Sequence, residues 1–323
     1  MTRQNFFVSG GAGFIGSTLC SALLERPSTN QVVVYDNFSS GRKWHLEHHE
    51  HDKRLKVVIA NIEDFSTLTN SMQGIDCVFH LASNPDISKA ATDPDIDFRQ
   101  GTILTRNIVE AARLNGISKI VYTSGSGVYG DQGENILSEA SSTAVPVSTY
   151  AASKIAGESL LCAYAHMFDL SVSVLRFANV VGAHQTHGVG FDFVKKLLNN
   201  PTALTILGDG CQTKSYIHVE DVVQAMLLAM NIMDTYKVFN VSTDDFISVN
   251  QIAVLAVETM KLDLSKVEFI YTGGPVGWKG DVPQMRMNSD SIKKIGWCTH
   301  FNSNEAISAS LAGIHKHALA GRL

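Results

Sequence analysis

Tyr150 and Lys154 are the two side chains in this sequence whose types and spacing best fit catalysis. They stand four residues apart in the segment "STYAASK", so a helix would carry both on one face. A phenol is a poor base at its usual pKa of roughly 10, but a neighbouring ammonium stabilises the phenolate and lowers that value. Tyr150 can then exchange a proton with a hydroxyl of a substrate. The same spacing occurs by chance on many helices, so the surrounding motifs decide whether the pair is catalytic.

A glycine-rich segment, "VSGGAGFIGS", follows the first apolar run of the chain. Its pattern is G-x-x-G-x-x-G, formed by Gly10, Gly13 and Gly16. The glycines allow a tight turn and a close approach of backbone to phosphate. The helix that begins near Phe14 and Ile15 then offers free N–H groups and the positive end of its dipole to a pyrophosphate. The segment therefore predicts a dinucleotide-binding site.

Asp36 ends the second apolar run, 20 residues after Gly16. A carboxylate at this place accepts hydrogen bonds from the ribose hydroxyls of adenosine and repels a 2′-phosphate, which favours NAD over NADP. Asn61 and Ile62 could frame the adenine, although a plain cap of the third strand would explain them nearly as well. The further cofactor contacts that we expect are Asn37, Leu81, Ala82 and Phe177.

Short apolar runs alternating with helical patterns must position these residues. The runs cover residues 5–10, 31–36, 55–61, 77–83, 119–125 and 171–179. They are almost continuously apolar, which is typical of parallel strands covered on both faces. With helices predicted over 101–115 and 149–168, they indicate a Rossmann-type, doubly wound α/β sheet.

The rhythm changes after Asn179, where shorter strands and longer loops follow. We therefore expect an NAD-binding Rossmann domain over residues 1–179, with part of 215–245 packing back on it. A smaller mixed α/β domain over 180–323 would bind the substrate.

Composition excludes several classes of protein. The chain has 323 residues, 45% of them hydrophobic, and a formal charge of −5, with no basic block of the kind that binds nucleic acid. Five scattered cysteines without a C-x-x-C pair favour reduced thiols and a cytoplasmic protein. The first residues are too short an apolar run for a signal segment, and no run of 18 apolar residues predicts a membrane span. We read the histidine-rich segment 45–51 as a solvated surface helix and predict no metal site.

The motifs together resemble the extended short-chain dehydrogenase/reductase superfamily and its NAD-dependent epimerase/dehydratase family. The motifs that carry the likeness are "GGAGFIGS", "HLAS", "VYG", "YAASK", "RFANVVG" and "YIHVEDV", which span nearly the whole chain. The likeness is greatest to UDP-sugar 4-epimerases of the UDP-glucose/UDP-galactose type. It implies a tightly held NAD that is reduced and reoxidised within one turnover, a transient 4-keto sugar, and a homodimer formed through the helices near 101–115 and 149–168.

The same resemblance implies roles for single residues. Tyr150 matches the catalytic tyrosine, and Lys154 matches the lysine that holds the nicotinamide ribose. Asn179 matches an asparagine that contacts the nucleotide diphosphate. Lys214 stands where the family usually has an arginine, so it keeps the charge but loses the bidentate geometry.

Three more positions belong to the expected substrate site. Asp281 matches a family aspartate near the nucleotide. The family's arginine just before it is a tryptophan here, which leaves Lys279 as the candidate cation. Thr205 could wall the uracil, although a core strand explains it nearly as well. Solvated surface lysines are the alternative for both, less favoured for Lys214 and as good an explanation for Lys279.

The loop "VYTSGSGVYG" is the largest departure from the family pattern. The superfamily's catalytic Ser or Thr stands five residues before the glycine of V-Y-G, and that place is Gly125 here. Ser124 or Ser126 could take over as the catalytic hydroxyl, a water could fill the space, or Gly125 could widen the pocket for an N-acetylhexosamine or a uronic acid.

The same loop separates reaction classes. Related 4,6-dehydratases carry an Asp–Glu pair where this chain has Ser126 and Gly127. Elimination of water needs such an acid and base, whereas epimerisation at C4 needs one acid–base group and the cofactor. We therefore expect a UDP-hexose 4-epimerase. The alternatives are another NAD-dependent nucleotide-sugar enzyme, such as a dehydratase or decarboxylase, and a non-catalytic NAD-binding regulatory protein.

Overall fold

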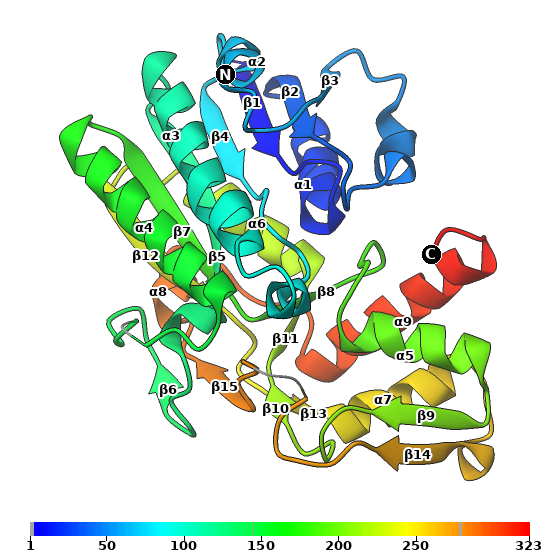
Figure 1. Ribbon diagram of the computed structural model, residues 1–323. Coiled ribbons are helices and arrows are strands. Elements are labelled where there is room, and N and C mark those ends of the chain that lie inside the picture. The colour runs from blue at the N-terminus through cyan, green and yellow to red at the C-terminus, as the bar shows by residue number, and fades with distance from the viewer. Residues whose placement is uncertain (1–2, 144, 278–279) are drawn as a thin grey trace. The chain divides into compact units, whose positions relative to one another are not determined.

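The computed structural model describes residues 3–143, 145–277 and 280–323 and divides the chain into two compact units (Figure 1). The first unit contains the described residues up to Val128, together with Thr149–Arg176 and Val223–Phe239. The second unit contains Tyr129–Ser148, Phe177–Val222 and Asn240–Leu323. The chain therefore passes between the units several times.

A seven-stranded sheet forms the centre of the first unit. Its strands, in spatial order, are β12 (Tyr236–Val241), β7 (Ser171–Phe177), β5 (Lys119–Gly125), β4 (Cys77–His80), β1 (Gln4–Ser9), β2 (Thr29–Asp36) and β3 (Leu55–Ile59). Strand β1 pairs in parallel with both β2 and β4, and the pairs β2–β3 and β4–β5 are parallel as well. The carboxyl ends of these strands therefore lie along one edge of the sheet, and the doubly wound fold expected from the sequence is confirmed.

Helices and turns connect the strands of the first unit. They are α1 (Phe14–Leu24), η1 (Lys43–His49), α2 (Phe65–Ser71), η2 (Ile87–Ala91), η3 (Phe98–Ile103), α3 (Leu104–Leu114), η4 (Ser126–Tyr129), α4 (Thr149–Met167) and most of α6 (Val219–Ala229). Helices α3 and α4 lie side by side (Figure 1). The helix expected over 101–115 begins earlier, because η3 forms a π-helical turn before α3.

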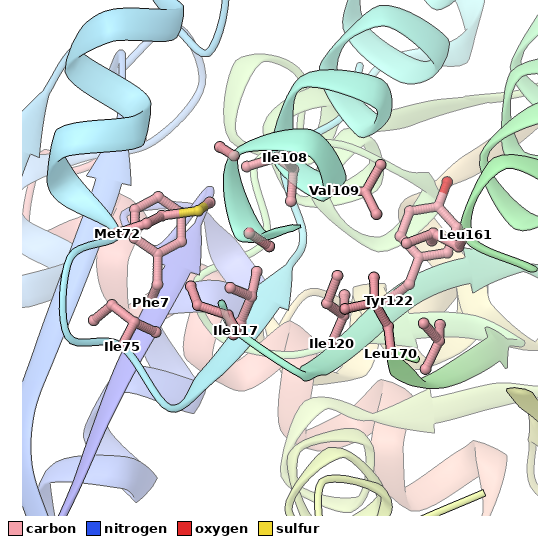
Figure 2. Close-up of a cluster of buried hydrophobic side chains, with 14 of the residues drawn as sticks. Phe7, Met72, Ile75, Ile108, Val109, Ile117, Ile120, Tyr122, Leu161 and Leu170 are labelled. Carbon is pink, nitrogen blue, oxygen red and sulfur yellow. The ribbon is translucent and has the colours of Figure 1, made fainter. Parts of the chain in front are cut away.

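The strands of the sheet are covered on both faces. Phe6, Phe7 and Val8 are consecutive in β1, so they point alternately to the two faces, and all three are fully buried. On one face, side chains of α2, α3 and α4 pack against the strands around Phe7 and Tyr122 (Figure 2). This burial explains why the apolar runs are almost continuous in the sequence.

The second unit combines three small sheets with helices. Its strands are β6 (Ile136–Leu137), β8 (Asn179–Val181), β9 (Ala203–Ile206), β10 (Thr213–Lys214), β11 (Tyr216–His218), β13 (Ile247–Ser248), β14 (Glu268–Tyr271) and β15 (Gln284–Met287). Its helical elements are α5 (Val189–Asn199), α7 (Val249–Thr259), η5 (Leu264–Lys266), α8 (Asp290–Lys293) and α9 (Ser303–Leu319). Capping boxes begin α7 at Ser248 and α9 at Asn302.

The histidine-rich segment differs from expectation. His45 is buried, with Nδ1 2.8 Å from the carbonyl oxygen of Ala12, and His49 Nε2 lies 2.8 Å from Ser21 Oγ. The prediction of a solvated surface helix is therefore wrong for these two side chains, because the short η1 turn packs against α1. None of the helices that the structure describes is both long and apolar enough to cross a lipid bilayer.

Candidate active site

The glycine loop after β1 has no room for side chains at two of its glycines. Gly10 has φ +73°, and a Cβ there would lie 2.9 Å from the backbone nitrogen of Ala82. A Cβ on Gly16 would lie 2.2 Å from the carbonyl oxygen of Gly10. The loop therefore lies against Leu81 and Ala82, which follow β4, and brings these backbone segments together at the carboxyl edge of the sheet.

The start of α1 is open to an anion. Gly13 is the N-cap residue and makes no side-chain cap, and the first turn of the helix contains no acidic residue. The first N–H groups of the helix thus lack partners from their own helix, and they lie at the positive end of its dipole. The start of α1 therefore has the charge and the free donors that suit a pyrophosphate group.

Asp36 is held in place at the end of β2. Its Oδ2 accepts a hydrogen bond from the N–H of Ala12 at 2.9 Å, and its Oδ1 accepts one from the N–H of Phe38 at 2.8 Å. Burial raises the pKa of Asp36, and the two backbone donors oppose that shift. The carboxylate therefore lies beside the glycine loop with its orientation set before any ligand binds.

The other residues proposed around the adenosine have two different environments. Asn37 Nδ2 donates to Asn61 Oδ1 at 2.7 Å, so these two side chains lie together at the ends of β2 and β3. Ile62 is buried in the core cluster, and its carbonyl oxygen accepts a hydrogen bond from Asn107. The structure brings Asn37 and Asn61 near the end of the Asp36 strand.

Tyr150 and Lys154 lie in the first turns of α4. Lys154 is almost completely buried, and its Nζ donates to the carbonyl oxygen of Thr123 at 2.8 Å and lies 5.5 Å from the centre of the Tyr150 ring. Burial lowers the pKa of Lys154 to about 8, against the nearby carboxylates of Glu158 and Asp97, which raise it. Burial also raises the pKa of Tyr150 to about 12. The end of β5 thus fixes the ammonium group beside the phenol.

The end of β5 contains one serine whose hydroxyl is already bonded, Ser124, and one position with free space, Gly125. Ser124 is buried and donates to Glu158 Oε1 at 2.6 Å, and Glu158 also pairs with Arg176 at 2.6 Å. Ser126 begins the η4 turn and is partly exposed. A Cβ added to Gly125 would meet no atom within 4 Å.

In the second unit, three of the expected substrate residues lie on neighbouring segments. Asn179 in β8 pairs with Tyr216 in β11, and their side chains are hydrogen-bonded. Lys214 Nζ lies 2.5 Å from Asp281 Oδ1, and burial together with the charge of Asp281 raises the pKa of Tyr216.

The remaining substrate candidates lie elsewhere. Thr205 is in β9, a strand of a different small sheet, and the end of β9 approaches the Asp281 loop through Leu207, which lies beside Gly277. Phe177 ends β7 and is buried. Lys279 lies outside the residues that the structure describes.

Residues 6–242 match the family described as the NAD dependent epimerase/dehydratase family. This chain belongs to that family. It is 38% identical over 243 residues to a UDP-glucose 4-epimerase of Mycolicibacterium smegmatis, an alignment that covers 73% of this chain and 76% of the relative. A crystal structure of a UDP-galactose 4-epimerase is similar with a TM-score of 0.86 and 33% identity, over 97% of this chain and 99% of that one. A UDP-glucose 4-epimerase of Thermus thermophilus in complex with NAD is similar with a TM-score of 0.84 and 26% identity, over 96% of this chain and 99% of that one.

Membership of the epimerase/dehydratase family confirms the resemblance seen in the sequence, and it makes NAD the cofactor of this protein. The residues that fit the cofactor are those of the uncapped α1 start and the Asp36 carboxylate. Among the residues described, no group of three or more His, Cys, Asp or Glu side chains could hold a metal ion.

Two residues near Tyr150 were not among the site residues expected from the sequence, although Ser83 ends the "HLAS" motif. Ser83, just after β4, is hydrogen-bonded to the Tyr150 side chain. Asp97 is buried and accepts hydrogen bonds from Asn84 at 2.9 Å and from Thr149 at 2.7 Å. A polar residue after a buried strand was a signal for Ser83, but nothing local in the sequence marks Asp97 as buried.

Proposed function

We propose that this protein inverts the configuration at C4 of a UDP-hexose, with NAD as its cofactor, through a transient 4-keto sugar. The observation that carries the proposal is the placement of Lys154 Nζ beside the Tyr150 ring at the carboxyl edge of the NAD-binding sheet. The similarity to 4-epimerases over nearly the whole chain supports the reaction class.

NAD, when bound, supplies the redox step at C4. Tyr150 acts on the oxygen at the same carbon: as a phenolate it takes the O4 proton, and as a phenol it returns a proton to O4 after the sugar has turned. Lys154 stabilises the phenolate through its charge, because a cation near a phenol favours the ionised form. Thr123 keeps the ammonium in place by accepting its hydrogen bond.

The loop after β5 favours epimerisation over elimination. Loss of water from the sugar needs a further acid and base near C5 and C6. The last residue of β5, Gly125, and the first two residues after it, Ser126 and Gly127, cannot serve as a carboxylic acid. Tyr150 is therefore the only acid–base group that the proposed reaction needs at O4.

We assign the UDP-sugar to residues of the second unit. Asn179 and Lys214 carry the donors for the diphosphate, and Asp281 holds the Lys214 ammonium until an anion competes for it. Thr205 and Lys279 complete the proposed set, with Thr205 on the side of the uracil. The sugar is a hexose, an N-acetylhexosamine or a uronate.

An activity screen tests the proposed function. The purified protein is incubated with NAD and separately with UDP-galactose, UDP-N-acetylgalactosamine and UDP-galacturonate, and the products are identified by NMR. We expect conversion of at least one substrate to its C4 epimer. A protein that binds NAD but converts none of them would instead be a non-catalytic NAD-binding protein, and products lacking water or carbon dioxide would indicate a dehydratase or a decarboxylase.

We also propose a homodimer formed through α3 and α4. Large apolar side chains are exposed near the ends of these adjacent helices, with Leu114 52%, Met167 70% and Phe168 38% exposed. Size-exclusion chromatography with light scattering should give twice the 35.1 kDa mass of the chain. A monomer mass would refute the dimer.

The cytoplasm is the compartment that we propose for this protein. Its five cysteines are free, and Cys20 and Cys77 are buried as thiols. A reducing compartment suits such a set. Fractionation of the source cells, with the protein detected by antibody, tests this placement.

A further inference from the structure

The Tyr150–Lys154 pair lacks a hydroxyl partner at the position where the sequence pattern leads one to expect it. That position is Gly125, which has no side chain and faces open space. The neighbouring Ser124 is buried, and its hydroxyl is engaged by Glu158 at 2.6 Å. Moving Ser124 toward Tyr150 would leave a buried carboxylate oxygen without this donor, which is costly.

A different hydroxyl already reaches Tyr150. Ser83 lies three residues beyond the end of β4, and its side chain is hydrogen-bonded to the Tyr150 side chain. Strand β4 pairs in parallel with β5, so its carboxyl end lies beside the end of β5, where Gly125 is the last residue. Ser83 therefore approaches the phenol from the neighbouring strand end.

The backbone on both sides of Ser83 is held firmly. The N–H groups of Leu81 and Ala82 donate to Ser9 Oγ at 3.2 and 3.4 Å. On the other side, Asn84 is buried, and its Nδ2 donates to Asp97 Oδ1 at 2.9 Å. The serine thus has little freedom to leave its position.

The carboxylate of Asp97 accepts hydrogen bonds from the neighbours of both Ser83 and Tyr150. Its Oδ1 holds Asn84, the neighbour of Ser83, and its Oδ2 accepts a hydrogen bond at 2.7 Å from Thr149, the neighbour of Tyr150. Asp97 is 1% exposed, so its bond with the buried Asn84 is shielded from water, whereas Thr149 is exposed. One carboxylate therefore links the two segments that carry Ser83 and Tyr150, which favours a fixed contact between their hydroxyls.

We propose that Ser83 is the hydroxyl partner of Tyr150 and takes the place left empty at Gly125. This inference rests on the proposed function, in which Tyr150 is the acid–base group. A serine hydroxyl can accept a hydrogen bond from the Tyr150 phenol and donate one to the phenolate, so it stays paired with Tyr150 in both protonation states. Ser83 gains and loses no proton overall, and it acts as a positioning residue through Tyr150.

The test compares Ser83→Ala with Ser83→Thr, which keeps the hydroxyl, and with Ser71→Ala on α2 as a matched control outside the site. Ser83→Ala should lower kcat on the order of 10²-fold with little change in KM, since the contact assists proton transfer and not binding. Ser83→Thr should retain most of the activity, and Ser71→Ala should match the unaltered protein. Circular dichroism and NAD content establish that each variant is folded.

A pH profile separates this role from a structural one. The groups that face Tyr150 are Lys154 on α4, Asp97 before η3 and Tyr122 on β5. All of them remain in Ser83→Ala. Loss of the donor to the phenolate should therefore raise the pKa of Tyr150 alone and move the acidic limb of the kcat profile to higher pH.

A second readout needs no turnover. Ultraviolet titration of the NAD-loaded protein reports the ionisation of its tyrosines. Subtracting the titration curve of the Tyr150→Phe variant leaves the ionisation of Tyr150. We expect it to shift to higher pH in Ser83→Ala. An unchanged titration and an unchanged kcat would overturn the proposal, as would the same losses in Ser126→Ala and not in Ser83→Ala. A wild-type protein without epimerase activity would refute the proposed function, while the titration would still decide the Ser83 contact.

Discussion

At the scale of single residues, the proposed acid–base role of Tyr150 depends on two opposed pKa shifts. Burial raises the pKa of Tyr150 to about 12, away from the range in which a phenol is a useful base. The same burial lowers the pKa of Lys154 to about 8, so at neutral pH the lysine is still mostly protonated. The hydrogen bond with Ser83 opposes the rise in the pKa of Tyr150, and the cation of Lys154 beside the phenol favours the phenolate as well.

Replacement of Tyr150 by Phe tests its role as the acid–base group. We expect kcat to fall by about 10²–10⁴-fold, the usual contribution of a positioned proton-transfer group, while bound NAD is retained. Turnover of the active UDP-sugar and NAD released on denaturation are the two measurements. Tyr164→Phe is the matched control, because Tyr164 lies on the same helix and its hydroxyl contacts Glu110 instead. Unimpaired turnover in Tyr150→Phe would rule out the mechanism.

At the scale of elements, the glycine loop and the loop after β5 respond differently to an added side chain. Gly16→Ser would place Cβ 2.2 Å from the carbonyl oxygen of Gly10 and should weaken NAD binding by about 1–3 kcal/mol, the cost of crowding a filled space. Gly125→Ser meets nothing within 4 Å and should leave NAD affinity and melting temperature unchanged. Calorimetric titration with NAD and thermal melts compare the two. Equal losses in both variants would contradict the geometry of the loops.

Helix α4, which carries the proposed catalytic pair, is fixed to the sheet by a buried ion pair. Arg176 in β7 contacts both carboxylate oxygens of Glu158 in α4, at 3.0 and 2.6 Å, and both side chains are less than 10% exposed. Ser124, at the end of β5, donates to the same carboxylate. These contacts join α4 to two strands and so position the first turns of the helix, which carry Tyr150.

Arg176→Met should lower the free energy of unfolding by about 3–5 kcal/mol, because it leaves the Glu158 carboxylate buried without its cation. The control is Arg113→Met, which removes the more exposed pair with Glu110 and should cost about 0–1 kcal/mol. Urea unfolding followed by circular dichroism measures both. If the two variants lost the same stability, the Arg176–Glu158 pair would not be the anchor of α4.

At the scale of the whole molecule, buried His80 should make stability depend on pH. Its ring nitrogens lie 2.8 Å from Ser9 Oγ and 3.0 Å from Thr105 Oγ1, and burial lowers its pKa from 6.5 to about 3. Between these two values the unfolded chain binds a proton that the folded chain does not. Stability is therefore fully present above pH 6.5 and is lost as the pH falls toward 3.

Between pH 3 and pH 6.5, His80 can change the unfolding free energy by at most about 1.4 kcal/mol per pH unit. His80→Asn should reduce the slope of the unfolding free energy against pH by up to this amount, as measured by urea unfolding at several pH values. His51→Asn, whose side chain is 94% exposed, is the control and should leave the slope unchanged. If the unfolding free energy of His80→Asn depended on pH as steeply as that of the unaltered protein, His80 would not take up a proton on unfolding.

The interleaved path of the chain makes a simple truncation unstable. A fragment of residues 1–179 would lack β12, an edge strand of the seven-stranded sheet, and α6. Val172 and Val174 of β7 would then lose part of the cover that keeps them fully buried. We expect no cooperative thermal transition for this fragment by circular dichroism, in contrast to the full chain. A cooperative transition with native-like helix content would contradict this expectation.

The sequence by itself determined the parts of this protein that depend on local spacing. The glycine pattern, the carboxylate of Asp36 after the second apolar run, and the pair Tyr150 and Lys154 are each readable within a few residues of a strand or helix end. The doubly wound sheet followed from apolar runs that stay buried on both faces. Because these signals lie along one element, they need no knowledge of what packs beside it.

Only the tertiary structure decided which distant residues meet. Ser83 and Tyr150 are 67 positions apart, and their contact depends on the carboxyl end of β4 lying near α4 and on Asp97 bracing both neighbours. The assignment of residues 129–148 to the second unit has the same origin. Parallel strands align their ends regardless of their separation in the chain, so spacing alone does not specify which strand-end side chains face one another.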